Sequence, residues 1–188
     1  MYKALFVLSI CCGWACNTNT TDNSLADILN EHFLTMVDTA AYQTGHLLQT
    51  PGVVGAPKYF SKIGVRVNQQ VVQEHRLVAS AQQVAKQRQW EGFEHVWQQQ
   101  KPIVNIPWGA VNKVGKFQLL WNSTKASTDE AVIAGTLDIN YFAASAKRAI
   151  VIFTVIDRNG KGGVSTVYFL QQTASTWKLL YSEDLEFM

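Results

Sequence analysis

The spacing of apolar residues changes from helical in the first half of the chain to alternating in the second half. From Ser24 onward, apolar side chains recur at intervals of three and four residues. Ser24 can cap a helix here, and Asp27 lies in its first turn, where a carboxylate is favourable. The pattern predicts a helix that starts at Ser24 and buries Leu25, Ile28, Leu29, Phe33, Met36, Val37 and Ala40.

The segment from Asn68 to Gln100 predicts two further helices with a boundary at Gly92. It is rich in Gln, Ala, Val and charged residues, a mixture that favours helix, and glycine commonly marks a helix end. Pro102 ends the segment, because proline lacks a donor and restricts the residue before it. Residues 50–57 read as a loop. The expected inward positions are Val71, Val78, Ala81 and Ala85, with Trp90, Phe93 and Trp97 on a second face.

The second half of the chain predicts strands separated by turns. Residues 131–141 alternate, with Ile139 and Tyr141 on one face and Asp138 and Asn140 on the other. Residues 149–156 are apolar on both faces apart from Thr154, which is typical of a central strand. An Asn-Gly turn within 157–163 and a second turn at 173–175 join the later strands. The five expected strands are 116–121, 131–141, 149–156, 164–171 and 177–181.

These elements predict one α+β domain over residues 24–188. The helices come first and the strands follow, so a common core requires one layer to cover the other. We expect the N-terminal helices to pack on one face of a five-strand antiparallel meander sheet. About 170 residues can bury such a core without cross-links.

Residues 1–15 predict a secretory signal. Lys3 precedes an uncharged run from Ala4 to Ala15, which gives the basic start and apolar middle of such signals. The run is shorter than the roughly 20 residues of a membrane-spanning helix. Small residues at Gly13 and Ala15 suit cleavage after Ala15. A lipoprotein, an ordinary secreted protein and an uncleaved anchor all stay open.

The stretch Gly13-Trp14-Ala15-Cys16 resembles the cleavage region of a bacterial lipoprotein. The resemblance implies that Cys16 is lipidated and becomes the new N-terminus. The polar run from Asn17 to Asn23 indicates a tether, which we place at residues 16–23, before the domain. Leu8-Ser9-Ile10-Cys11 is a competing frame in which Cys11 is the acceptor. If Cys16 is the acceptor, the same resemblance implies the outer rather than the inner membrane, because Asn17 and not Asp follows it. We therefore expect an exported protein of the outer membrane or periplasm of a Gram-negative bacterium.

The three cysteines all lie before Asn17. The body of the chain therefore forms no intrachain disulfide, although export leads to oxidising surroundings. The formal net charge of the full chain is +2 at pH 7. Residues 58–116 hold nine basic side chains against Glu74, Glu91 and Glu94, without a run of Lys or Arg or a nucleic-acid motif. A solvated helix face explains that segment, and we expect no nucleic-acid partner.

The C-terminal stretch VYFLQQTASTWKLL, residues 167–180, resembles the end of a nuclear transport factor 2-like (cystatin-like) domain. Such domains close with an apolar strand, a polar turn and a Trp-Lys-apolar strand. The resemblance implies a curved sheet and, for the enzymes of the family, a cone-shaped pocket with an Asp, His or Tyr. The family also includes binding and assembly modules, and fold alone does not choose among these functions.

The candidate catalytic residues are Asp138, Asn140, Tyr141 and Tyr168. A carboxylate beside an amide on one strand face can act as a base with its orienting group. The alternative for Asp138 and Asn140 is a polar solvent face.

Other chemistries have less support in the sequence. Glu91 and His95 have the spacing of two ligands on a helix face, but catalytic zinc needs three, so we expect no metal and no cofactor. The chain has neither a Gly-x-Ser-x-Gly motif nor a glycine-rich phosphate loop. Tryptophan side chains line pockets or partner surfaces, or more commonly form core; they are Trp90, Trp97, Trp108, Trp121 and Trp177.

The sequence favours an exported noncatalytic binding or accessory protein over an enzyme. An export signal, a polar tether and the lack of a catalytic motif favour it, and the expected partner is a protein or a small ligand, with a membrane contact through the lipid anchor. The alternative is a small-molecule isomerase or dehydratase with a cystatin-like fold, in which Asp138, Tyr141 or Tyr168 does the acid and base work.

Overall fold

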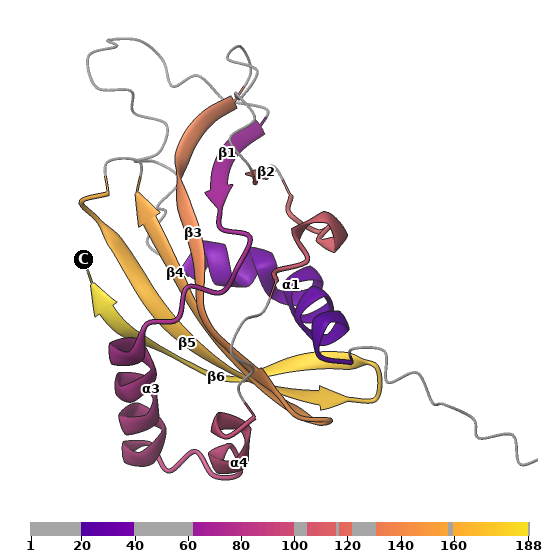
Figure 1. Ribbon diagram of the computed structural model, residues 1–188, viewed down its shortest axis with the longest axis vertical. Helices are drawn as coiled ribbons and strands as arrows, with labels where there is room; N and C mark the ends of the chain where they lie inside the picture. The colour runs from indigo at the N-terminus through magenta and orange to yellow at the C-terminus, as the bar shows by residue number, and fades with distance from the viewer. Residues whose placement is uncertain are drawn as a thin grey trace, which may run out of the picture.

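The chain forms helices and strands around one sheet, which confirms the α+β class (Figure 1). The computed structural model describes residues 20–39, 62–99, 105–115, 117–121, 131–157 and 160–187. The expected signal, Cys11, Cys16, the tether up to residue 19, the loop at 50–57 and the boundary at Pro102 lie outside the described residues. The elements are α1 (Thr20–Thr39), β1 (Lys62–Val67), α3 (His75–Gln87), α4 (Glu94–Trp97), the 3-10 helix η1 (Trp108–Ala110), β2 (Phe117–Leu120), β3 (Ala131–Ala144), β4 (Arg148–Asp157), β5 (Gly163–Thr173) and β6 (Thr176–Phe187).

The sheet is mixed and has six strands in the order β2-β1-β3-β4-β5-β6. Strands β3 to β6 form the expected antiparallel meander. The prediction of five antiparallel strands was wrong, because β1 joins the sheet parallel to both β2 and β3. Parallel neighbours need a long crossover, and α3 and α4 lie in the connection from β1 to β2. Such distant pairing leaves no local pattern in the sequence.

Helix α1 covers one face of the sheet. It begins at Thr20 rather than at Ser24, and its predicted stripe is confirmed up to Val37, the last of these residues whose side chain is described. The same core contains Val151, Phe153 and Val155 of β4, which alternate along the strand and therefore share a face. The stripe residues are fully buried: Leu25, Ile28, Leu29, Phe33, Met36 and Val37.

Helices α3 and α4 cover the opposite face. Ile150 and Ile152 of β4 point away from α1 by the alternation of a strand, and they pack in a second core. Figure 1 shows α1 and the α3–α4 pair on different sides of the curved sheet. The prediction that the helices share one face was wrong, because a strand that is apolar on both faces needs cover on both. The second core includes Leu77, Ala81, Ala85, Phe93, Val96, Tyr141, Ala143, Val167 and Phe169.

Three successive residues of α1 tie the helix to distant segments. The Asn30 amide donates to the Ala110 carbonyl at 2.9 Å and accepts from the Asn112 N–H at 2.7 Å. The Glu31 carboxylate accepts from the Trp177 N–H at 2.5 Å. His32 Nε2 lies 2.6 Å from the Trp177 carbonyl and must donate, since that oxygen only accepts. These bonds give the glutamate–histidine pair of α1 a structural role.

Candidate functional site

A β-bulge in β3 decides on which face of the sheet Tyr141 lies. Ile139 pairs with Phe153 and Tyr141 pairs with Ile152, so Asn140 is an extra residue in the ladder. The bulge shifts the alternation by one place. Tyr141 therefore packs in the α3–α4 core, on the face that also carries Asn140 and Asp138. The prediction that Tyr141 lies opposite them was wrong for this reason.

Asn140 is buried and belongs to a chain of side-chain hydrogen bonds below the start of α3. The Thr154 hydroxyl donates to Asn140 Oδ1 at 2.5 Å, and Thr154 Oγ1 lies 2.8 Å from Ser165 Oγ. Asn140 Nδ2 donates to the Val72 carbonyl at 3.4 Å. Because Thr154 has one proton and gives it to an oxygen that only accepts, Ser165 must be the donor to Thr154. The Ser165 proton is thus committed within the sheet and is not directed at a substrate.

Asp138 lies at the edge of this network and is partly buried. Asn68 Nδ2 donates to Asp138 Oδ1 at 2.5 Å. Burial raises the pKa of Asp138 above its ordinary value, the hydrogen bond from Asn68 lowers it, and the nearby Glu74 carboxylate raises it. Burial is the largest of these effects, so the neutral form of Asp138 is favoured more than in an exposed aspartate.

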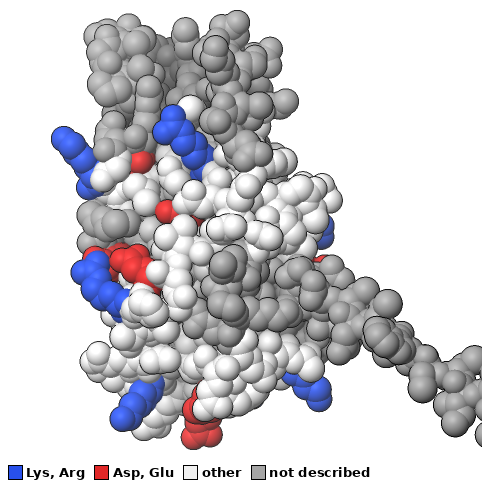
Figure 2. Space-filling model, in the orientation of Figure 1, with Lys and Arg blue, Asp and Glu red and all other residues white. Residues whose placement is uncertain are grey.

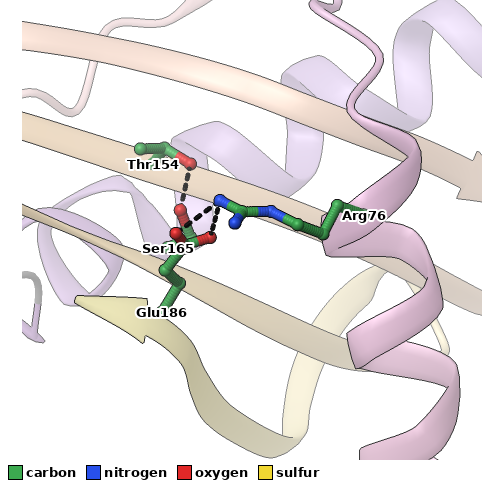
Figure 3. Close-up of polar contacts among 4 residues, drawn as sticks. All are labelled: Arg76, Thr154, Ser165 and Glu186. Carbon is green, nitrogen blue, oxygen red and sulfur yellow. Dashed lines mark hydrogen bonds and ion pairs between the residues drawn. The ribbon is translucent and has the colours of Figure 1, made fainter. Parts of the chain in front are cut away.

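One polar residue from each of β3 to β6 forms a row across the sheet. The ladders pair Asp138 with Thr154, Thr154 with Ser165, and Ser165 with Glu186. At the end of the row Arg76 of α3 contacts both carboxylate oxygens of Glu186, one of them at 2.6 Å (Figure 3). The Arg76 side chain is 69% exposed, so this ion pair adds little to stability. It links the start of α3 to the end of the row.

The two candidate tyrosines lie on opposite faces of the sheet. The Tyr141 hydroxyl donates to the Trp97 carbonyl at 3.2 Å, and burial raises the pKa of Tyr141 to about 12. The Tyr168 hydroxyl donates to the Met36 carbonyl of α1 at 3.3 Å. The structure therefore brings Asp138, Asn140 and Tyr141 to one face and places Tyr168 with the α1 core.

A groove of about 590 Å³ lies between the second half of α3 and α4. Its volume falls within the roughly 300–1,000 Å³ of small-molecule sites. Trp90 and Trp97 line it and are partly buried, whereas the polar lining residues are exposed. The remaining lining residues are Gln82, Ala85, Lys86, Gln89, Glu91, Phe93, Glu94 and Gln98. Asp138 is not among them.

The aromatic side of the groove is rigid, since each ring packs on the sheet. Trp90 stacks on Tyr181 of β6, with ring centres 4.7 Å apart and planes 6° apart. Trp97 packs against Tyr141 at 5.2 Å. Both indoles also pack against Phe169 in T-shaped, edge-to-face contacts. Such pairs resist rearrangement because each ring fixes the orientation of its neighbours.

The turn between α3 and α4 shapes one wall of the groove and is pinned by Arg148 of β4. Gly92 has a φ of +82°, a conformation that glycine adopts easily. Arg148 Nη1 donates to the Glu91 carbonyl at 3.0 Å, and its guanidinium carbon lies 4.9 Å from the centre of the Phe93 ring. The Gly92 N–H donates to the Glu94 carboxylate at 2.9 Å. The expected boundary at Gly92 is confirmed.

The tryptophans that the sequence singles out divide into three kinds. Trp108 and Trp177 are core, each 3% exposed. Trp90 and Trp97 line the groove. Trp121 is exposed. The shared face of Trp90, Phe93 and Trp97 was visible in the sequence, but the groove was not, because its turn depends on Arg148, far along the chain.

Figure 2 shows basic and acidic side chains scattered over this face between uncharged areas, including the lower left, where Figure 1 places α3 and α4. The described residues hold no group of three or more His, Cys, Asp or Glu side chains placed to bind a metal ion. No helix within the described segments combines the length and apolar character needed to cross a membrane. No protein-family model, curated protein or solved structure matches the chain.

Proposed function

We propose that this chain is an exported, noncatalytic binding protein of the bacterial envelope, and that it binds its partner or ligand in the groove between α3 and α4. The observation that carries the proposal is the groove itself, with two packed indoles on one side and exposed polar side chains around it. A concave site with a rigid apolar surface and a few polar groups is the usual form of a binding site.

Two side chains on the sheet favour binding over catalysis. A base for isomerisation or dehydration must reach a substrate proton. The hydroxyl of Tyr141 is bonded to Trp97, and a pKa of about 12 keeps the phenol protonated near neutral pH. Asp138 is held by Asn68 and is not part of the groove lining. We therefore prefer the binding protein to the isomerase or dehydratase.

The proposed anchor is a lipid on Cys16, with Cys11 as the competing acceptor. Its support comes from the sequence: a basic start, an apolar run and Ala15 before Cys16. Intact mass and N-terminal peptide sequencing of the protein from native membranes test it. A diacyl or triacyl group on Cys16 is expected. An unmodified N-terminus in a soluble fraction would remove the anchor and leave the groove proposal in place.

Photocrosslinking in intact cells tests the groove. A benzophenone amino acid replaces Gln98, which lines the groove, or Gln99, which is also exposed but is not in the lining. We expect an adduct from position 98 and much less from position 99. Equal yields at the two positions, or none at either, would contradict binding in the groove.

A further inference from the structure

The polar side chains around the groove offer hydrogen-bond donors and acceptors in a mixed arrangement. Gln82, Gln89 and Gln98 are exposed lining residues. Their amides make no hydrogen bond within the described part of the chain. Each amide supplies a carbonyl acceptor and two N–H donors. A ligand in the groove thus meets three groups that both donate and accept hydrogen bonds.

The charges around the groove nearly cancel. The groove lining has one ammonium group, on Lys86, and two carboxylates, on Glu91 and Glu94. The Arg148 guanidinium lies behind the turn, where it donates to the Glu91 backbone carbonyl and packs over the Phe93 ring. An anionic ligand such as a phosphate would face more carboxylate than ammonium. The lining therefore favours a neutral ligand.

We infer that the groove binds a neutral saccharide of pyranose rings, an inference that rests on the proposed binding function. The C–H groups on the faces of a pyranose ring are apolar and pack against the remaining surface of Trp90 and Trp97, as other apolar groups do on indole. Sugar hydroxyls both donate and accept, so they satisfy amides, carboxylates and an ammonium group together.

A proline-rich peptide is the main competing ligand for an aromatic groove. Its backbone offers carbonyl oxygens and few donors, because proline has no N–H. The carboxylates of Glu91 and Glu94 would then lack donors from the ligand. A saccharide supplies those donors, which is why the lining favours it.

Isothermal titration calorimetry of the full chain in detergent tests the inference with chitotriose, cellotriose and maltotriose as probes. At least one of the three is expected to bind. The Gln82→Ala/Gln98→Ala double variant removes two groove amides and is expected to weaken binding about tenfold. The matched control is Gln83→Ala/Gln99→Ala, which removes two exposed amides outside the lining; its affinity stays within about twofold of the parent.

Three results would overturn the inference: no heat with any of the three trisaccharides, equal weakening in the control variant, or binding of a polyproline peptide without saccharide binding. The crosslink at Gln98 separates failure of the ligand class from failure of the groove. A Gln98-specific adduct with a protein, together with no saccharide binding, removes the saccharide and keeps the binding function. Failure of both experiments removes both.

Discussion

Replacing Gly92 with alanine should destabilise the turn that shapes the groove. An alanine Cβ at this position would lie 1.6 Å from Arg148 Nη1 and 2.5 Å from Arg148 Cζ. Neither distance is tolerable, so the guanidinium must move away from the Glu91 carbonyl and the Phe93 ring. The positive φ of +82° adds a second cost, because it is strained for any residue with a Cβ.

The expected loss of unfolding free energy is about 2–4.5 kcal/mol. The left-handed backbone costs about 1–2 kcal/mol. The hydrogen bond from Arg148 to Glu91 contributes about 0.5–1.5 kcal/mol, and the cation–π contact with Phe93 about 0.5–1 kcal/mol. Urea unfolding followed by tryptophan fluorescence measures the sum. A loss of this size is a large share of the roughly 5–15 kcal/mol by which domains are stable.

Two other glycines separate the cost of the strained backbone from the cost of moving Arg148. Gly160 has a φ of +66° and nothing within 4 Å of its added Cβ, so Gly160→Ala should show the backbone cost alone. Gly109 has open space and no positive φ, so Gly109→Ala should be close to neutral. In an Arg148→Ala background, Gly92→Ala should cost only about 1–2 kcal/mol, the backbone term. An equal cost of Gly92→Ala in both backgrounds would refute the role given to Arg148.

Three further substitutions test the polar side chains on the sheet. Thr154→Val leaves the Asn140 oxygen and the Ser165 hydroxyl unpaired in the core and should cost about 1–3 kcal/mol in urea unfolding; Thr154→Val/Ser165→Ala should cost less than the sum of the single changes. Asp138→Asn should gain stability relative to the parent as pH rises, measured by unfolding at pH 4 and pH 8 with ~0.1 M salt. Tyr141→Phe should lose about 1 kcal/mol, because the hydroxyl bond to the Trp97 carbonyl is lost.

The sign for Asp138 follows from its raised pKa. The folded protein holds the proton more tightly than the unfolded chain, so the contribution of Asp138 is fully present below the unfolded pKa. It is lost as pH rises through the higher folded pKa. The Asp138→Asn variant has no such loss, because an amide does not titrate in this range. A variant that gains no stability over the parent between pH 4 and pH 8 would contradict burial as the dominant effect on this carboxyl.

The other two substitutions have equally direct tests. An additive result for Thr154→Val and Ser165→Ala would show that their hydroxyls do not share one network, since coupled residues are non-additive. A Tyr141→Phe variant as stable as the parent would show that the bond to Trp97 adds nothing to the packing of the ring.

Local patterns were sufficient for the elements whose partners are close in sequence. The stripe of α1 and the turns after β4 and β5 depend on neighbouring residues, and they were predicted. Ala174 has a φ of +56° in the turn expected at 173–175. By contrast, buried and exposed side chains also alternate along β1, with Val65 and Val67 buried. That alternation could have revealed the strand, but not its two parallel neighbours, because they are set by distant pairing.

The candidate site was predicted in part for the same reason. The position of Asp138 and Asn140 on one face follows from the period of a strand. Tyr141 joins them only because of the bulge, which leaves no mark in a single sequence. The apolar run of β4 on both faces did indicate that both faces of the sheet are covered. It was the order of the elements, helices before strands, that led to the expectation of a single covered face.

The sharpest test of the groove is the set of indole N–H signals in a ¹⁵N–¹H NMR spectrum of the full chain. The protein is titrated in turn with chitotriose, cellotriose and maltotriose. Trp108 and Trp177 are core residues, each 3% exposed, and serve as internal controls. We expect at least one trisaccharide to shift the signals of Trp90 and Trp97 while those of Trp108 and Trp177 stay in place. Unchanged Trp90 and Trp97 signals with all three sugars, or shifts confined to Trp121, would contradict saccharide binding in the groove.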